Sequence, residues 1–214
     1  VRSDAAARVL DALFGTVAAE LGLSLRVVHT DGMQPVGRGI GPALEARDVL
    51  AVLRRSEDAP ADLRERALAL AGDVLEIGGA ATAGCGMARA METLDSGAAL
   101  RKFEAMCTAQ GGMREPAVSA LQHVVTATRA GRIEGIDNRR LARLAKLAGA
   151  PRAPTAGLEL HTRLHGLVDR GEPLMTIHAE TPGELDYARA YLAANPQVVE
   201  LEARHDRTPN GASA

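Results

Sequence analysis

The sequence is poor in the residue types that mark several classes of protein. Its 214 residues include two cysteines, no tryptophan and 2% aromatic residues. Two cysteines that form no CxxC pair imply neither a disulfide framework nor a zinc knuckle. With so few aromatic residues and a net charge of −2, there are neither stacking platforms nor a basic field for nucleic acid. We therefore do not expect a nucleic-acid-binding protein.

Long apolar runs are also absent. No stretch approaches the roughly 20 consecutive apolar residues of a membrane helix, and the opening VRSDAAARVL lacks the apolar core of a signal peptide. The hydrophobic content of 46% is nevertheless enough for a sizeable core. These features predict a globular, cytoplasmic protein that does not bind membranes.

The first half of the chain has the spacing of amphipathic helices. Apolar residues recur every three or four positions through 4–21, which predicts a helix with one buried stripe that ends at Gly22. Residues 23–29, LSLRVVH, have the composition of a strand. Together with a helix that starts at Pro42, they indicate part of an α/β layer with parallel strands. Further helices are predicted at about 61–77, 84–94 and 98–110.

The second half has shorter, β-rich segments. HVVTATRAGRIEGID, at 123–137, predicts a hairpin, and Asp137 is placed to cap the helix that follows. Two more strands are predicted at 157–164 and 173–180. Thr181 and Glu184 have the spacing of a capping box that starts a helix, and residues 197–201 predict a last strand. The predicted fold is a partial α/β layer with several helices, followed by a C-terminal α+β domain.

A glycine-rich loop, TDGMQPVGRGIGPALEARDVL at 30–50, allows three interpretations. The amides at the start of the following helix favour an anion such as phosphate. The glycines also suit a tight strand-to-helix connection in which they only relieve crowding. In the third interpretation, loop carbonyls and the carboxylate of Glu45 or Asp48 bind a hard cation. The spacing G-x-G-x-G-P matches neither the dinucleotide fingerprint nor a P-loop.

The same loop resembles the segment TD-x-x-QP-x-G-x-x-(I/V)-G-x-ALE of the thymidine and pyrimidine-nucleoside phosphorylases, in the branch that contains the AMP phosphorylases. GRIEGIDNRRLARLAKLAGAP and GLELHTRLHGLVDRGEPLMTIHAE resemble the C-terminal domain of that family. The resemblance implies that residues 1–114 are the C-terminal part of the phosphorylase α/β domain. It also implies that 115–204 are the C-terminal, barrel-sandwich-like α+β domain, and 205–214 are expected to be a disordered tail.

The resemblance implies an activity for the full-length protein. Such enzymes are pentosyltransferases that use phosphate to split a pyrimidine nucleoside, and thymidine is the expected substrate in a dimeric enzyme of nucleoside salvage. The family's phosphate- and base-binding motifs are missing, and Lys102 and Lys146 are the only lysines. We therefore expect a C-terminal fragment that is inactive alone, with no catalytic residue. AMP phosphorolysis and a stand-alone binding or regulatory domain remain alternatives.

One cofactor follows from the same resemblance. Some family members hold a potassium ion through two loop carbonyls and an acidic side chain. Carried over by position, these ligands are the carbonyls of Val36 and Gly39 and the carboxylate of Asp48. Potassium is therefore the one cofactor expected, in the full-length enzyme.

Histidines in the second half allow one more metal hypothesis. His161 and His165 have zinc-compatible spacing, with Glu159 and His178 as additional candidates. On a strand, residues four apart are about 13 Å from each other, which is too far for one metal unless the chain bends. The alternative is that these are half-buried histidines of a sheet.

Overall fold

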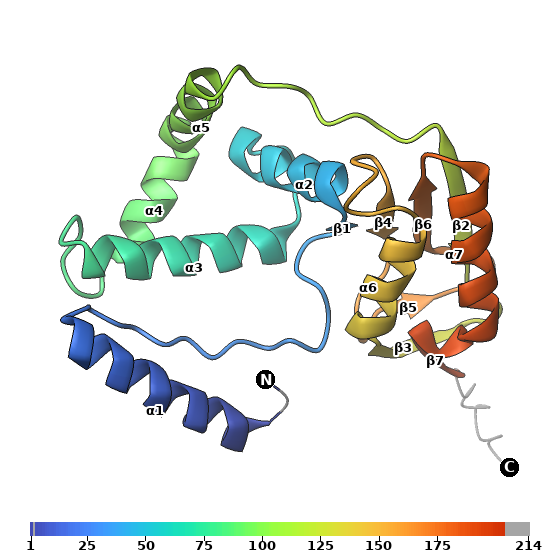
Figure 1. The fold of residues 1–214 in the computed structure, drawn as a ribbon, viewed down its shortest axis with the longest axis horizontal. Helices are drawn as coiled ribbons and strands as arrows, with labels where there is room; N and C mark the ends of the chain where they lie inside the picture. Colours follow the sequence, from blue (N-terminus) through green and yellow to red (C-terminus); the bar gives the residue numbers. More distant parts are fainter. Residues whose placement is uncertain (2, 204–214) are drawn as a thin grey trace, which may run out of the picture. The chain divides into compact units, whose positions relative to one another are not determined.

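The computed structural model describes residue 1 and residues 3–203 (Figure 1). They form two compact units: unit 1 comprises Val1–Gly32 and Val52–Met113, and unit 2 comprises Met33–Ala51 and Arg114–Ala214. The glycine loop thus groups with the second half of the chain. Assignment of 1–114 and 115–204 to the two phosphorylase domains stays a prediction, and the expected tail at 205–214 lies outside the described residues.

Unit 1 is helical. Its helices are α1 (Asp4–Leu21), α3 (Ala61–Ile77), α4 (Gly86–Asp95) and α5 (Ala98–Ala109), close to the predicted ranges. A small core joins Leu68 of α3 to Ala90 and Leu94 of α4 and to Val52, and the partly buried Ala99 of α5 packs against it. The backbones of α3 and α4 approach so closely that a Cβ atom on Gly72 would lie 2.7 Å from the Met87 amide nitrogen. The crossing of these two helices therefore depends on glycine.

Helix α1 differs from its prediction in the environment of its apolar stripe. The Ser3 side chain caps its start, and Gly22 ends it with a φ of 64°. Leu13 is 58% exposed and Phe14 50% exposed, whereas Ala18 is the buried residue of the helix. The prediction of a buried stripe is therefore wrong for the described part of the chain, because amphipathic spacing shows that a helix has an apolar face but not what covers it.

Residues 23–29 are extended but form no strand, so that prediction is wrong. Polar contacts hold the segment instead: the Arg26 guanidinium pairs with Asp73 and Glu76 of α3, and His29 lies 2.7 Å from Asp11. A β-rich composition makes a strand only where a second strand offers its backbone. The expected parallel layer is also not found, because every strand pair in the described residues is antiparallel.

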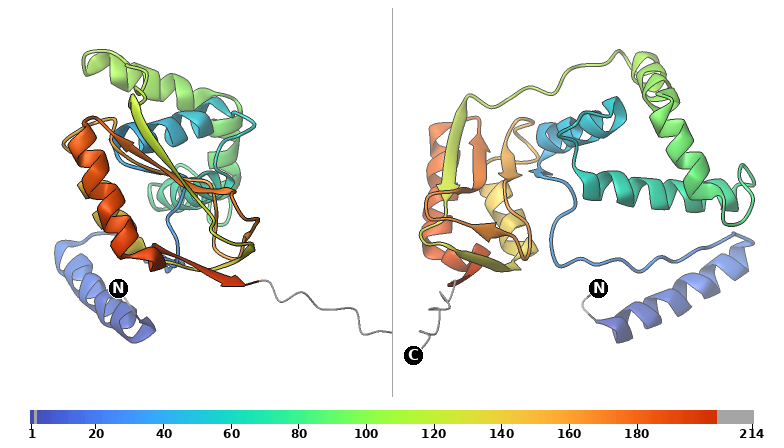
Figure 2. Two further views of the ribbon diagram at one scale, coloured as in Figure 1. Left: turned by 90° about the vertical axis from the view of Figure 1, so that its right-hand side faces the viewer. Right: turned by 180° about the vertical axis from the view of Figure 1, so that it is seen from behind.

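Unit 2 contains two small sheets (Figure 2). The first has the order β1-β4-β6-β2 and the second β5-β3-β7. Their strands are β1 (Gly39–Ile40), β2 (Leu121–Thr126), β3 (Gly131–Ile136), β4 (Gly157–Leu160), β5 (Leu167–Val168), β6 (Pro173–Ala179) and β7 (Val199–Ala203). The predicted mixed α/β fold, with several helices followed by a C-terminal α+β domain, is confirmed, although its first part forms no parallel layer in the described residues.

The predicted hairpin at 123–137 is wrong. Strand β2 pairs with β6, whereas β3 pairs with β5 and β7, so the two segments belong to different sheets. Ala127 explains the change: its amide donates to the Glu172 carbonyl at 2.8 Å, and its carbonyl accepts from the Gly171 amide. These bonds tie the segment after β2 to the turn before β6 rather than back onto β3.

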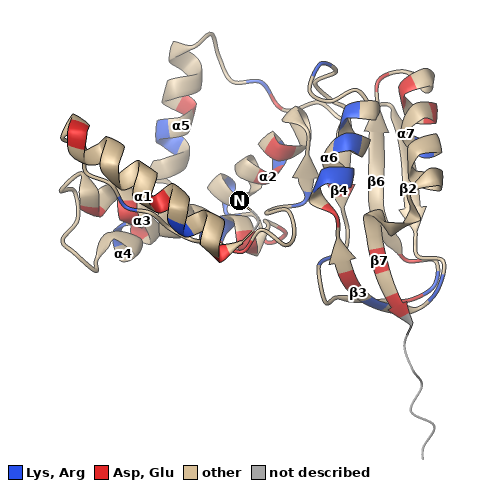
Figure 3. Cartoon of the chain, turned by 60° about the horizontal axis from the view of Figure 1, so that its bottom comes forward, with Lys and Arg blue, Asp and Glu red and all other residues tan. Residues whose placement is uncertain are grey.

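Helices cover one face of the first sheet. Helix α6 (Asn138–Leu147) packs against β4, and α7 (Pro182–Ala194) packs against β6 and β2. The predicted caps are confirmed: Asp137 accepts from two amides of α6, and Thr181 and Glu184 form the capping box of α7. Leu141 and Leu144 of α6 are fully buried. Figure 3 shows the basic residues of α6 in blue.

Helix α2 (Pro42–Arg54) follows the glycine loop, as the sequence predicts. Its first residues pack within unit 2 and so help to position the loop. Across residues 1 and 3–203, no helix has the length and apolar character that a bilayer span requires.

Candidate functional site

The glycine loop is shaped by close backbone approaches. A Cβ atom on Gly39 would lie 2.6 Å from the carbonyl oxygen of Leu44 and 2.8 Å from the amide nitrogen of Glu45, both in the first turns of α2. Gly41 has a φ of +135°, and a side chain there would overlap the Ala156 carbonyl. Both positions require glycine because the loop backbone lies directly against the backbone of other residues, with no room for a side chain. The structure therefore supports the tight strand-to-helix connection.

The amides around the start of α2 already have partners. Ala43 donates to the Pro154 carbonyl at 3.0 Å, and the Gly41 amide donates to the Glu45 carboxylate at 2.9 Å. An anion at this helix end would have to displace both acceptors. The phosphate-binding interpretation of the loop therefore has no support in this geometry.

Asp48 holds the loop from α2. One of its carboxylate oxygens accepts from the amides of Arg38, at 2.6 Å, and Gly39, at 2.8 Å. The other oxygen lies 3.6 Å from the Arg38 Nε atom, and Asp48 is 7% exposed. A buried carboxylate that accepts two amide hydrogen bonds fixes the path of the chain from 38 to 39.

The predicted potassium ligands lie in this region. The structure brings Gly39 and Asp48 together, and Val36 lies three residues earlier in the same loop. Two carbonyls and a carboxylate are oxygen ligands of the kind that hard cations take. The Arg38 guanidinium beside Asp48 opposes a second positive charge, and the Asp48 carboxylate is already engaged by amides. Potassium binding by these three residues stays a prediction.

A polar cluster lies on the face of the first sheet that is opposite the core. Leu158 and Leu160 of β4 point into the core, so Glu159 between them points outward. Glu159 is directly opposite Thr176 in the register of β4 and β6, which places both on one face. His161 Nε2 lies 2.8 Å from the Thr176 hydroxyl oxygen.

Two residues with buried nitrogen atoms lie beside this cluster. His178 of β6 is 2% exposed, and neither of its ring nitrogens has a hydrogen-bond partner among the described residues. Its Nε2 atom lies 3.7 Å from a Glu159 carboxylate oxygen, which is an ion-pair distance. Arg47 Nη1 of α2 is likewise buried without such a partner. Glu159 is therefore surrounded by donors.

These neighbours determine the charge of Glu159. His178 beside it, together with the positive potential of Arg47 and His161, lowers the pKa of Glu159 below its ordinary value, although partial burial acts in the opposite direction. The carboxylate is therefore ionised at neutral pH. Glu159 therefore gives this face of the first sheet a negative charge.

Glu159 is one of the residues that line a cavity of about 280 Å³. This cavity is called the outer cavity below. Its lining residues come from the glycine loop and from β4 with the residues after it: Gly37, Arg38, Glu159, Leu160, His161, Thr162 and Arg163. The loop and the strand are joined directly, because the Leu160 amide donates to the Arg38 carbonyl at 2.8 Å.

The zinc hypothesis is not supported. Residues 1 and 3–203 contain no group of three or more His, Cys, Asp or Glu side chains arranged to hold a metal ion. His165 lies in a turn with a φ of 66°, away from the strand geometry of its neighbours. Of the four candidates, the structure brings Glu159, His161 and His178 together as a hydrogen-bonding and charged cluster.

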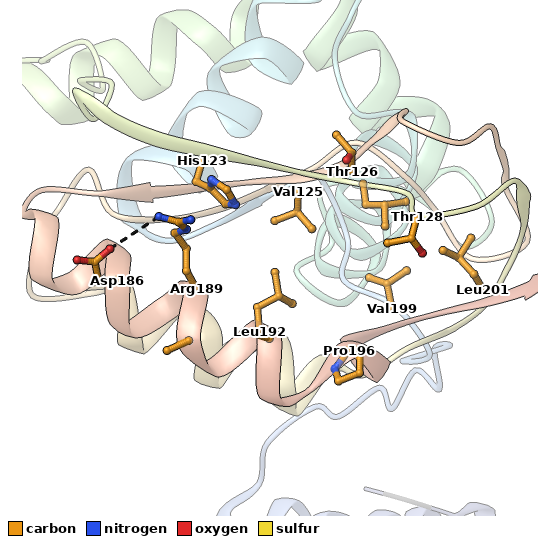
Figure 4. Close-up of a pocket in the computed structure, with 13 residues that line it drawn as sticks. His123, Val125, Thr126, Thr128, Asp186, Arg189, Leu192, Pro196, Val199 and Leu201 are labelled. Atoms are coloured by element: carbon orange, nitrogen blue, oxygen red, sulfur yellow. Dashed lines mark ion pairs between the residues drawn. The ribbon is translucent and has the colours of Figure 1, made fainter.

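A second cavity, of about 620 Å³, lies between β2, α7 and β7 (Figure 4). Its wall is mainly apolar, with Val125, Leu192 and Val199 among its lining residues. At one end, Arg189 faces His123 and pairs with Asp186 at 3.8 Å. Burial, followed by the positive charge of Arg189, lowers the pKa of His123, so its ring is neutral at neutral pH.

Sequence reasoning did not identify the second cavity. The alternation of β2 places His123 and Val125 on one face, and Ala190 and Ala193 of α7 leave room opposite them. The only sign of this cavity in the sequence is the pair of small residues, Ala190 and Ala193, about one helical turn apart. The pair indicates a cavity only once α7 is known to pack against β2.

Comparison with known proteins identifies part of this unit. Residues 132–198 match the model of the "Pyrimidine nucleoside phosphorylase C-terminal domain". The resemblance inferred from the sequence is thus confirmed, and Glu159, His161 and His178 lie inside the matched region.

Relatives of the whole chain point the same way. Three proteins, each named "Putative thymidine phosphorylase", come from Polaromonas sp., Sphingopyxis alaskensis and Hahella chejuensis, with identities of 60%, 55% and 54%. The matches cover 94%, 95% and 94% of this chain. They cover 39%, 40% and 40% of the relatives, so the chain spans about two fifths of their length.

The close approach at Gly39 predicts a steric effect. Gly39→Ala should lower the free energy of unfolding by about 1–3 kcal/mol, because the new methyl group overlaps backbone atoms that cannot rotate away. Gly183→Ala is the matched control, since its Cβ would meet nothing within 4 Å, and it should not destabilise. Urea unfolding followed by circular dichroism compares the two, and equal midpoints would contradict the proposed crowding.

The lowered pKa of Glu159 predicts a pH-dependent contribution to stability. A carboxyl group whose pKa is lowered in the folded state stabilises the fold above its ordinary pKa, and this contribution is lost as the pH falls through the lowered value. Glu159→Gln should therefore cost about 1 kcal/mol at pH 7. The difference from wild type should disappear at acidic pH.

Thermal melts from pH 7 to about pH 3 measure this difference. Glu202→Gln, at an exposed position of β7, is the control and should follow the wild-type curve throughout. A Glu159→Gln deficit that stays constant across the pH range would show that the substitution acts through packing rather than through charge.

Proposed function

We propose that this chain serves in the reversible phosphorolysis of thymidine, as the C-terminal part of a larger pentosyltransferase. The reaction converts a pyrimidine deoxynucleoside and phosphate into the free base and 2-deoxyribose 1-phosphate. The observation that carries this proposal is the 60% identity to the Polaromonas relative over 94% of this chain.

The reaction needs phosphate- and base-binding groups, and this chain has only two lysines that could contribute to them. Positive charge develops on the sugar and negative charge on the departing base, so an enzyme must position a phosphate dianion and donors around the base. The two lysines of the chain, Lys102 on α5 and Lys146 on α6, are both exposed. We therefore assign phosphate and base binding to the part of the relatives that this chain does not match, and the chain alone should be inactive.

The proposal includes the setting of the enzyme. We expect a cytoplasmic homodimer that acts in pyrimidine nucleoside salvage. AMP phosphorolysis is the alternative substrate assignment, because the glycine loop resembles both branches of the family. A stand-alone binding or regulatory module is the alternative of another class, and it predicts that the chain has no role in phosphorolysis.

A chimera tests the activity. The region of the Polaromonas relative that matches this chain is replaced by this chain, and the chimera is assayed with phosphate and thymidine, uridine, cytidine or AMP. Thymidine should give the largest kcat/KM, within about tenfold of the unmodified relative, because 60% of the aligned residues are identical in the two proteins.

Three controls make the result interpretable. The unmodified relative shows whether the assay detects phosphorolysis, this chain alone should show none, and a thermal melt shows that the chimera is folded. A folded chimera without phosphorolysis, beside an active relative, would contradict the proposal. Preferential use of AMP would favour the alternative substrate.

The potassium proposal makes a separate prediction. If Val36, Gly39 and Asp48 bind the ion in the full-length enzyme, potassium stabilises the folded chimera by RT ln(1 + [K⁺]/Kd), about 0.4 kcal/mol when its concentration equals Kd. Melting of the chimera in potassium chloride and in N-methylglucamine chloride at equal ionic strength measures the effect. Asp48→Asn, which keeps an oxygen acceptor but removes the charge, should abolish it.

Asp169→Asn is the control, because Asp169 is an exposed carboxylate of the same unit and should leave the potassium effect unchanged. Identical wild-type midpoints in both salts would remove the proposed ion site. Asp48 would then serve only to hold the loop through the amides of Arg38 and Gly39.

A further inference from the structure

The second cavity, drawn in Figure 4, borders the core of unit 2. Leu174 and Val199 belong to that core, Val125 and Leu192 pack against it, and all four residues line the cavity. Its volume of about 620 Å³ falls in the middle of the range for small-molecule sites, roughly 300–1,000 Å³. An apolar group in this cavity would therefore contact side chains of the core.

Two small residues of α7 keep the cavity open. Ala190 and Ala193 line it about one helical turn apart, on the helix that packs against β2. Each side chain is a single methyl group, so the space between α7 and β2 is left unfilled. A larger side chain at either position would occupy that space.

Hydrogen-bonding side chains border one end of this cavity. Figure 4 shows Arg189 of α7 and His123 of β2 pointing toward each other there. Across residues 1 and 3–203, neither side chain forms a hydrogen bond. The one partner of Arg189 is Asp186, whose carboxylate oxygen lies 3.8 Å from Arg189 Nη1. The donors of Arg189 and His123 are therefore available to a ligand.

The ion pair with Asp186 does not occupy Arg189. The two atoms are too far apart for a hydrogen bond, and the side chains of Arg189 and Asp186 are 53% and 75% exposed. An ion pair between such exposed groups contributes little, because water screens it. A ligand can therefore engage the Arg189 guanidinium without first breaking a strong contact.

The available donors favour a carboxylate over other head groups. A guanidinium group binds a carboxylate through paired, parallel N–H donors, and the neutral ring of His123 has one N–H to donate. An ammonium group would meet the repulsion of Arg189, and a hydroxyl group would gain no paired, charge-assisted contact. Asp186 opposes a second negative charge only weakly, because it is largely exposed to water.

The apolar wall selects the rest of the ligand. Inorganic phosphate and free sugars have no apolar body that could displace water from Val125, Leu192 and Val199. A hydrocarbon chain or a ring without polar groups gains this contact. The ligand that satisfies both parts of the cavity has an apolar body with one carboxylate at its end.

We propose that the second cavity binds an amphipathic carboxylic acid, with its apolar body between β2, α7 and β7 and its carboxylate at Arg189 and His123. This site uses neither the glycine loop nor the outer cavity. It goes beyond the phosphorolysis proposed above and does not depend on it.

Calorimetric titration of the chain with four probes tests the site. Octanoate carries both groups, octanol carries the apolar chain with a neutral head, octylamine carries a cation, and acetate carries the anion alone. Octanoate should bind about tenfold more tightly than any of the other three, since it alone satisfies both parts of the cavity. From butanoate to octanoate, each added methylene should tighten binding by roughly twofold to fourfold.

Two substitutions separate the two parts of the site. Arg189→Gln should weaken octanoate by about tenfold and leave octanol unchanged, because it removes the paired donors of the carboxylate. Ala193→Phe should weaken octanoate and octanol by a similar factor, since the ring fills the apolar part of the cavity. Both residues are exposed, so both variants should fold, which a thermal melt checks.

Matched controls use the same residue types elsewhere in unit 2. Arg170→Gln and Ala194→Phe change exposed residues outside the cavity lining, and both should bind the probes as the wild type does. Equal losses in these controls would overturn the proposal, because the probes would then bind elsewhere, for example on the exposed apolar face of α1.

Three further results would also overturn the proposal. The first is octanoate that binds no more tightly than acetate, and the second is octanol or octylamine that binds more tightly than octanoate. The third comes from sedimentation: a dimer that Ala193→Phe dissociates would show that a second copy of the chain, rather than a carboxylic acid, occupies the cavity.

Discussion

The buried carboxylate of Asp48 is the contact on which the site depends. By accepting the amides of Arg38 and Gly39, it fixes the point where the loop turns toward β4. The Arg38 carbonyl then receives the Leu160 amide, so the loop becomes the edge of the first sheet. One side chain on α2 thus couples a helix, a loop and a strand. The position of Arg38 in the outer cavity follows from this coupling.

The outer cavity illustrates how a sheet with one covered face gains a polar site on the other. Strand alternation sends Leu158 and Leu160 into the core and leaves Glu159 on the opposite face, where His178 lies beside it and Arg47 adds positive potential. Burying donors is costly unless an acceptor is near, and burying part of a carboxylate is costly unless donors surround it. Here the Glu159 carboxylate lies 3.7 Å from His178 Nε2, and its lowered pKa shows that the positive neighbours outweigh its partial burial.

Features set by neighbouring residues could be predicted from the sequence. The caps at Asp137 and Thr181 and the start of α2 at Pro42 depend on residues within one helical turn, and all are present. The hairpin at 123–137 could not be excluded, because Leu121 of β2 pairs with Ala179 of β6, far along the chain. The exposure of the apolar face of α1 could not be predicted from the sequence either, since helical spacing does not identify what covers an apolar stripe.

The candidate site shows the same division between local and distant information. Glu159, His161 and His178 could be named from the sequence as polar residues on strands, but their role depends on the register of β4 against β6. Glycine spacing was ambiguous for a physical reason, because the same lack of a side chain permits close approach of a ligand or of another backbone. At Gly39 the approaching atoms belong to Leu44 and Glu45, only five and six residues ahead. Helical geometry from Pro42 onward, rather than a ligand, therefore accounts for that glycine.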